Sequence, residues 1–190
     1  VQAIQLATSL PRAKQQGPAA LAERTAAALD RVHRGVAINP HYRKLTAEVA
    51  EPFTALRDWE NAVWILESVA TSRPHVTALW AGLAVGYAEL GKPAQAQNAL
   101  REVQRLKPDA VSTVTLQAVL LNRAGQPQAA IDLLSAQFDA GRYDYDMAQT
   151  GYAMGLETQN WPMAIRALEL RNSTWPDQAA DGHFRLGIIY

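Results

Sequence analysis

The chain of 190 residues contains no cysteine, which excludes disulfides, thiol catalysis and zinc sites with cysteine ligands. Its longest apolar run, 78–88, is about half as long as the ~20 residues that a membrane-spanning helix needs. Lys and Arg together number 18, as do Asp and Glu, so the formal net charge is zero. Repeat proteins that bind nucleic acid carry a basic surplus. The composition therefore disfavours both a membrane-spanning segment and a nucleic-acid partner.

Signatures of catalysis and cofactor binding are missing as well. The sequence has no G-x-S-x-G elbow, no G-x-x-x-x-G-K-[ST] loop and no G-x-G-x-x-G fingerprint. No two histidines stand at the i, i+4 spacing of a helical metal pair, so we interpret all four as surface or capping residues: His33, His41, His75 and His183. We predict no catalytic residue, no cofactor and no metal site.

Two further features have a functional and a structural interpretation. Asp144 and Asp146 flank Tyr145; a carboxylate pair can work as acid and base, but acids at a helix start also stabilise its N-terminus. Trp59 and Trp161 could be binding anchors or could pack over the corner between two helices. The structural interpretation is favoured in both cases.

What the sequence does contain is a repeat. Alanines recur every 34 residues, at Ala28, Ala62, Ala96, Ala130 and Ala164, and prolines follow the same interval at Pro40, Pro74, Pro108 and, two periods later, Pro176. A repeated helix–turn–helix unit of 34 residues is typical of a helical solenoid. A small residue where two helices cross lets their backbones approach to about 8–10 Å, which explains the alanine column.

The prolines set the boundaries of the repeats. We predict four full repeats over 43–178, namely 43–76, 77–110, 111–144 and 145–178. Residues 1–20 are expected to form a broken helix or a linker, 21–42 a half-repeat helix, and 179–190 the first helix of a further repeat. Because the chain opens at Val1 without an initiating Met and stops at Tyr190 within an apolar pattern, we expect it to be a region of a longer protein.

Individual repeats show how the helices are built. In repeat 77–110, Trp80, Leu83, Ala84 and Tyr87 share one helical face, and Gly91 is suited to the left-handed conformation that ends a helix. In the first helix of repeat 145–178, Gly151 and Gly155 replace larger residues, so we predict a gap or a local shift there.

These columns resemble the tetratricopeptide repeat (TPR), whose pattern is W-x2-L-G-x2-Y, then A, F and P. Repeat 77–110 matches it with Trp80, Leu83, Ala84, Tyr87, Ala96, Leu100 and Pro108. The resemblance covers about residues 21–190 and implies an all-α, right-handed solenoid of helical hairpins.

A narrower resemblance rests on short blocks at 39–46, 58–65, 72–74, 143–146 and 170–172. They are similar to stretches of the bacterial O-antigen ligase and polymerase group, including its protein O-oligosaccharyltransferases. Members resembling this chain end in a soluble periplasmic helical-repeat region. The catalytic residues of that family belong to segments absent here, so none is assigned to this chain.

The TPR resemblance implies that the first helix of each repeat lines a concave groove for a peptide, a helix or another segment of the parent chain. The clamp that chaperone-binding relatives use for a terminal carboxylate is missing, because Ala47 and Glu51 stand at its positions. Residues 1–20 are an alternative occupant of the groove. The predicted lining is Lys44, Ala78, Ala81, Val85, Ala88, Glu89, Ser112, Thr115, Val119, Asn122, Arg123, Asp146 and Gln149.

Two functions follow as hypotheses. The first is a non-catalytic, periplasmic protein-interaction module at the C-terminus of a membrane-embedded glycan ligase or oligosaccharyltransferase, where it positions an acceptor protein or a partner. The second is a stand-alone TPR scaffold in an envelope assembly or secretion complex, with a cytoplasmic or outer-membrane-associated location as the alternative. A free-standing enzyme would need a cluster of titrating polar residues, which the sequence does not show.

Overall fold

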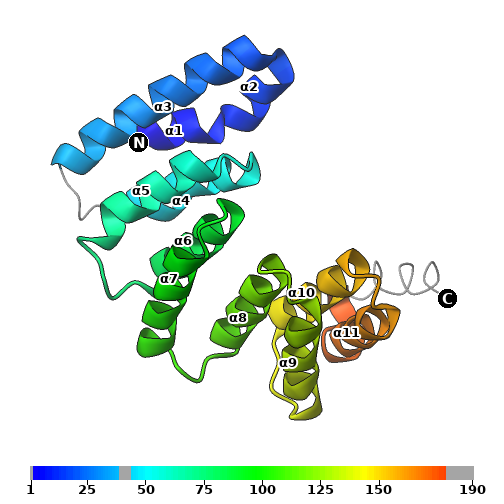
Figure 1. The fold of residues 1–190 in the computed structure, drawn as a ribbon. Coiled ribbons are helices and arrows are strands. Elements are labelled where there is room, and N and C mark those ends of the chain that lie inside the picture. Colours follow the sequence, from blue (N-terminus) through cyan, green and yellow to red (C-terminus); the bar gives the residue numbers. More distant parts are fainter. Residues whose placement is uncertain (1, 39–43, 179–190) are drawn as a thin grey trace. The chain divides into compact units, whose positions relative to one another are not determined.

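The computed structural model describes residues 2–38 and 44–178, and the described part of the chain is all-helical (Figure 1). The predicted fifth repeat at 179–190 lies outside these residues. The helices are α1 (Gln2–Thr8), α2 (Leu10–Gln16), α3 (Pro18–Ile38), α4 (Lys44–Ala55), α5 (Trp59–Ala70), α6 (Thr77–Glu89), α7 (Pro93–Leu106), α8 (Val111–Arg123), α9 (Pro127–Asp139), α10 (Tyr145–Glu157) and α11 (Trp161–Thr174), followed by the 3-10 turn η1 (Pro176–Gln178).

The chain divides into two compact units, 1–106 and 107–190, which are the N-terminal and the C-terminal unit. In the N-terminal unit α4 packs against α5 and α6 against α7, and in the C-terminal unit α8 packs against α9 and α10 against α11. The first helices of three hairpins begin at 77, 111 and 145, which is the 34-residue interval of the sequence. The prediction of an all-α fold of TPR-type hairpins is confirmed.

The alanine column is buried. Ala28, Ala62, Ala96, Ala130 and Ala164 are all 5% exposed or less. A side chain of this size permits the close approach of paired helices. At Ala164 that approach is seen directly, because a Cβ atom built on Gly155 of α10 would lie 2.8 Å from the Cβ of Ala164 on α11.

The turn inside each hairpin uses the left-handed backbone conformation at one fixed position. Gly91 and Gly125 have φ values of 67° and 74°, and the residues at the same position of the other two hairpins, Arg57 and Gln159, also have positive φ, at 59° and 57°. Only glycine adopts this region without steric cost. The first and last of these four turns thus hold a residue that disfavours their conformation.

Polar side chains cap the start of three helices. Asp58 and Asn160, just before α5 and α11, accept hydrogen bonds from the backbone N–H groups of Asn61 and Met163, and each satisfies a donor that the helix itself leaves unpaired. At the start of α10, Asp144 accepts from the N–H of Met147 at 2.8 Å. The carboxylate of Asp144 is therefore a helix cap, as the structural interpretation of the Asp144–Asp146 pair predicted.

Of the predicted N-terminal segment 1–20, the described residues 2–20 form α1 and α2, with a break at Ser9, and then the start of α3. Helix α1 packs against both α3 and α4; Ala7 and Leu10 are fully buried. The broken pair α1–α2 accordingly takes the place of a first helix beside α3, as Figure 1 shows.

Of the gap or local shift predicted at α10, the gap is wrong. Gly151 and Gly155 are buried, and a Cβ atom built on Gly151 would lie 3.1 Å from the Phe138 ring and 3.2 Å from the Cβ of Ala167. The absent side chains leave no void, because the neighbouring helices close the space. Glycine here permits tight packing instead of marking an irregular helix.

Candidate functional site

In the N-terminal unit, the predicted lining residues lie along one accessible stripe of α6. Ala78 is exposed, and Ala81, Val85, Ala88 and Glu89 are half-buried. The spacings of three and four residues keep the first four on one helical side. Lys44 is the first residue of α4, and its side chain lies outside the described part of the structure.

The other face of α6 carries the four residues of the repeat pattern, which differ in burial. Leu83 and Ala84 are buried, at 2% and 0% exposure, but Trp80 and Tyr87 are only half-buried. The indole N–H of Trp80 donates to the carbonyl of Pro74 at 2.8 Å. Trp80 and Tyr87 therefore stand at the border between the core and the surface.

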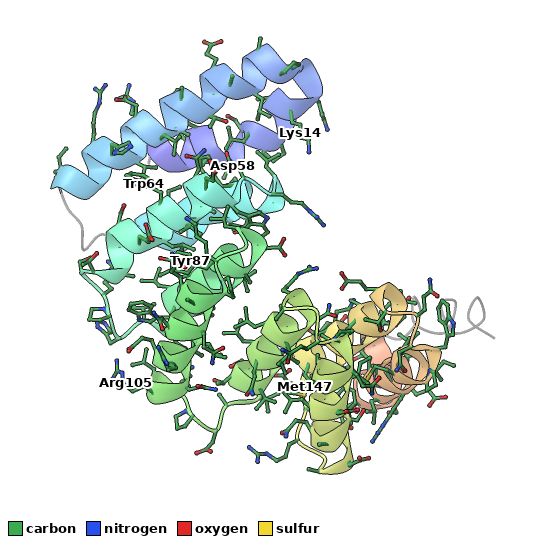
Figure 2. All side chains as sticks on the ribbon, in the orientation of Figure 1. Lys14, Asp58, Trp64, Tyr87, Arg105 and Met147 are labelled. Atoms are coloured by element: carbon green, nitrogen blue, oxygen red, sulfur yellow. The ribbon has the colours of Figure 1, made fainter. Side chains whose placement is uncertain are left out.

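Tyr87, which is labelled in Figure 2, is linked to the preceding hairpin. Its hydroxyl donates a hydrogen bond to the carboxylate of Glu67 on α5. Burial of the phenol, together with the hydrogen bond to Glu67 and the charge of that carboxylate, raises the pKa of Tyr87 to about 12. The phenol is thus held neutral as a donor.

In the C-terminal unit, the lining residues of α8 include a polar end. Ser112 is exposed, and Thr115 and Val119 are half-buried. At the end of the helix, Asn122 Nδ2 donates to Glu157 Oε2 at 2.9 Å, and Arg123 Nη1 pairs with Glu157 Oε1 at 3.0 Å. One carboxylate on α10 therefore binds both side chains and ties the first helices of two neighbouring hairpins together.

The lining residues of α10 are Asp146 and Gln149. Asp146 is exposed and Gln149 is half-buried. Gln149 Oε1 accepts a hydrogen bond from Arg171 Nη1 on α11 at 2.7 Å. The amide of Gln149 is thus held in place by a residue of the second helix.

Arg171 is the polar residue that the sequence reasoning did not find. Its side chain is 4% exposed, and its guanidinium carbon lies 6.0 Å from the centroid of the Tyr145 ring. Residues one and two periods earlier are Gln137 and Val103. A comparison of the repeats would have shown that this position holds an apolar residue at 103 and polar residues at 137 and 171.

The hydrogen bonding of this polar cluster is incomplete within the described residues. Nε and Nη2 of Arg171 and both polar side-chain atoms of Asn172 have no partner there. Asn172 is 7% exposed. Buried polar groups of this kind destabilise a fold unless they are paired, so the cluster is an exception within the mainly apolar core of the C-terminal unit.

The described residues contain no group of three or more His, Cys, Asp or Glu side chains placed to hold a metal ion. None of the described helices combines the length and hydropathy of a membrane-crossing segment. Trp161, at 48% exposure, and the half-buried Trp59 occupy the first positions of α11 and α5.

Comparison with known proteins identifies the fold. The chain matches no protein-family model and no curated protein. Among solved structures it is similar to a thermophilic TPR protein of Thermus thermophilus, with 16% identity, a TM-score of 0.65 and coverage of 99% of this chain and 97% of that one. It is also similar to a chain of the APC/C hetero-tetramer Cut9–Hcn1 (14% identity, TM-score 0.58, 90% of this chain and 34% of that one).

A third similar structure is PilW, a widely conserved type IV pilus biogenesis factor, with 18% identity, a TM-score of 0.52 and coverage of 76% and 70% of the two chains. At these identities the likeness establishes the fold. The chain is a TPR-like helical-repeat protein.

Proposed function

We propose that this chain is a non-catalytic protein-interaction module that binds a peptide or a helix along the accessible side of its first helices. The observation that supports the proposal is the composition of α6. Its sequence carries no charged residue before Glu89 at its last position, yet Ala78, Ala81, Val85 and Ala88 remain accessible.

A helix that is apolar on all sides is ordinarily buried on all sides. The second helix of the same hairpin behaves differently, because its exposed residues include Gln95, Gln97, Asn98 and Arg101. The apolar accessible stripe is therefore confined to the first helix, and it has the spacing that a docked helix or an extended peptide uses.

In the C-terminal unit the equivalent positions on α8 are more polar. Ser112, Thr115 and Asn122 carry hydroxyl and amide groups that can pair with a peptide backbone. These polar groups can orient a peptide bound along α8 of the C-terminal unit, while the stripe of α6 offers mainly apolar contact to a peptide bound on the N-terminal unit.

Photo-cross-linking in native cells tests the proposal. A photoreactive amino acid at Ala81 should capture a discrete protein partner, identified by mass spectrometry, whereas the same group at the exposed Ala94 of α7 should not. Equal capture from the two positions, or capture from Ala94 alone, would contradict binding along the first helices.

The setting of the module is a second part of the proposal. We propose that the chain is the periplasmic C-terminal region of a membrane-embedded ligase of the O-antigen ligase and oligosaccharyltransferase type, where it positions an acceptor protein. Support comes from the sequence blocks at 39–46, 58–65, 72–74, 143–146 and 170–172. A stand-alone envelope scaffold is equally compatible with the fold, and the likeness to the pilus biogenesis factor PilW favours keeping it as the alternative.

Cell fractionation distinguishes the two settings. An antibody against the 190-residue chain should detect a band far heavier than 20.8 kDa in the inner membrane if the chain belongs to a membrane glycosyltransferase. A soluble or outer-membrane band of modest size would overturn that setting and support the scaffold.

A further inference from the structure

A pocket of about 420 Å³ lies between α6 and α7, wholly within the N-terminal unit. This volume falls within the usual range of small-ligand sites. Helix α6 contributes two aromatic side chains, and α7 contributes mainly polar ones. The lining consists of Trp80, Tyr87, Gln95, Asn98, Ala99, Arg101 and Glu102.

The two aromatic residues are fixed by contacts outside the pocket. The Trp80 indole donates to Pro74, and the Tyr87 hydroxyl donates to Glu67. Their polar atoms are therefore already occupied, and what they present to the pocket is ring surface. A spacing of seven residues places both rings on the same side of α6, about 10 Å apart along the helix.

The charges of the pocket offset one another. Arg101 and Glu102 line the same space with opposite sign. The Arg101 guanidinium donates to the Asn98 amide oxygen, and Glu102 forms an ion pair with Arg105 at 2.9 Å. Neither a cation nor an anion gains a net attraction from this lining, so an uncharged ligand suits it best.

We propose that this pocket is a second peptide-binding site, which takes an aromatic side chain of an extended peptide between Trp80 and Tyr87. Aromatic side chains prefer edge-to-face or offset contacts with other rings, and the pocket offers two rings held in place. The amide of Gln95 combines donor and acceptor groups, and the amide nitrogen of Asn98, whose oxygen accepts from Arg101, is a donor; both side chains can therefore pair with the peptide backbone beside the anchor.

This site is separate from the stripe of the proposed function. At about 100° of rotation per residue, Trp80 and Tyr87 point to a side of α6 that lies roughly 80–160° away from Ala81, Val85 and Ala88. The two proposals can therefore fail independently, because a variant on one side leaves the other side intact.

The test uses the 190-residue chain and three blocked peptides, acetyl-Ala-Trp-Ala-amide, acetyl-Ala-Leu-Ala-amide and acetyl-Ala-Lys-Ala-amide. Each is titrated against isotope-labelled protein and followed by nuclear magnetic resonance, with the Trp80 indole N–H as a reporter. The Trp peptide should shift residues of α6 and α7 around the pocket and should bind roughly two- to tenfold more tightly than the Leu and Lys peptides, the range that aromatic pairing supplies.

Variants locate the binding. Asn98→Ala should lower the affinity for the Trp peptide roughly three- to fivefold, because one hydrogen bond between the protein and the peptide is lost. Gln97→Ala, at the exposed neighbouring position of α7, should have no effect. Because both residues are exposed, neither change threatens the fold.

Three results would overturn the proposal. One is that the Trp peptide changes the chemical shifts of residues scattered over both units. Another is that the Lys or Leu peptide binds as tightly as the Trp peptide. The third is stronger binding of methyl β-glucopyranoside than of any peptide in the same pocket, which would identify a carbohydrate site.

Discussion

Gly155 on α10 lies so close to Ala164 on α11 that a Cβ atom at Gly155 would stand 2.6 Å from the Ala164 backbone nitrogen and 2.8 Å from its Cα. Real Cβ atoms do not approach backbone atoms this closely, so the two helices can pack in this way only with glycine at 155. Gly155 is the residue that replaces a larger side chain in this repeat, and Ala164 is one of the alanines that recur every 34 residues.

Gly155→Ala should therefore lower the free energy of unfolding by about 1–3 kcal/mol, the usual cost of overpacking. The same change inside a helix without this contact stabilises by roughly 0.5–1 kcal/mol, so the sign of the effect is diagnostic. Urea unfolding followed by circular dichroism measures it. Adding Ala164→Gly should not restore stability, since the closest atoms belong to the backbone; a full rescue would contradict the close approach.

The turn of the last hairpin offers a stabilising change. Gln159 has φ of 57°, in the conformation that Gly125 adopts at the same place of the preceding turn. Left-handed backbone costs a side chain-bearing residue roughly 1–2 kcal/mol. Gln159→Gly should raise the melting temperature, and Gly125→Ala should lower it. A lower melting temperature for Gln159→Gly would show that the turn does not hold the left-handed conformation.

Arg171 should be replaceable by an apolar side chain of similar length. Its Nε and Nη2 lack partners among the described residues, and buried charged groups are often exchanged for hydrophobic residues without loss. Arg171→Met should leave the free energy of unfolding equal or higher, whereas Arg171→Ala should lower it by about 2–5 kcal/mol, as truncations of large buried side chains do. A large loss in Arg171→Met would mean that the guanidinium is paired by residues outside the described range.

The raised pKa of Tyr87 gives a pH dependence with a definite sign. The phenol of an unfolded chain loses its proton near pH 10, while that of folded Tyr87 loses it at about 12. Between these values the folded state binds more protons, so stability falls as the pH rises. The stability deficit of Tyr87→Phe relative to the wild type should shrink when urea unfolding is measured above pH 10 instead of below it. A deficit that does not change with pH would contradict the shift.

Much of the fold follows from the 34-residue interval. The first helices of repeats 77–110, 111–144 and 145–178 begin at 77, 111 and 145. The interval predicts these starts because each repeated residue type meets a local need: alanine permits close packing of paired helices, and proline and glycine suit the turns between helices. The pairing of α1–α2 with α3 was harder to predict. Proline and glycine at 11, 17 and 18 indicate a break in the helix but not the helices against which the pieces pack.

The candidate site was predictable only in outline. Periodicity places Ala81, Thr115 and Gln149 at corresponding positions, and these side chains are all half-buried. It says nothing about Glu157 binding both Asn122 and Arg123, or about Arg171 reaching Gln149, because such contacts join side chains from different helices. Partner binding by the predicted lining stays a prediction.

The measurement that tests the central claim most directly is the affinity of the partner captured at Ala81 for four proteins: the wild type, Ala81→Arg, Ala88→Arg and the control Ala94→Arg. A charged side chain that must be desolvated on the stripe of α6 should weaken binding by roughly tenfold or more, with unchanged circular dichroism, and the control should bind as the wild type does. Normal binding by both Ala81→Arg and Ala88→Arg would contradict the assignment of the first helices as the binding face.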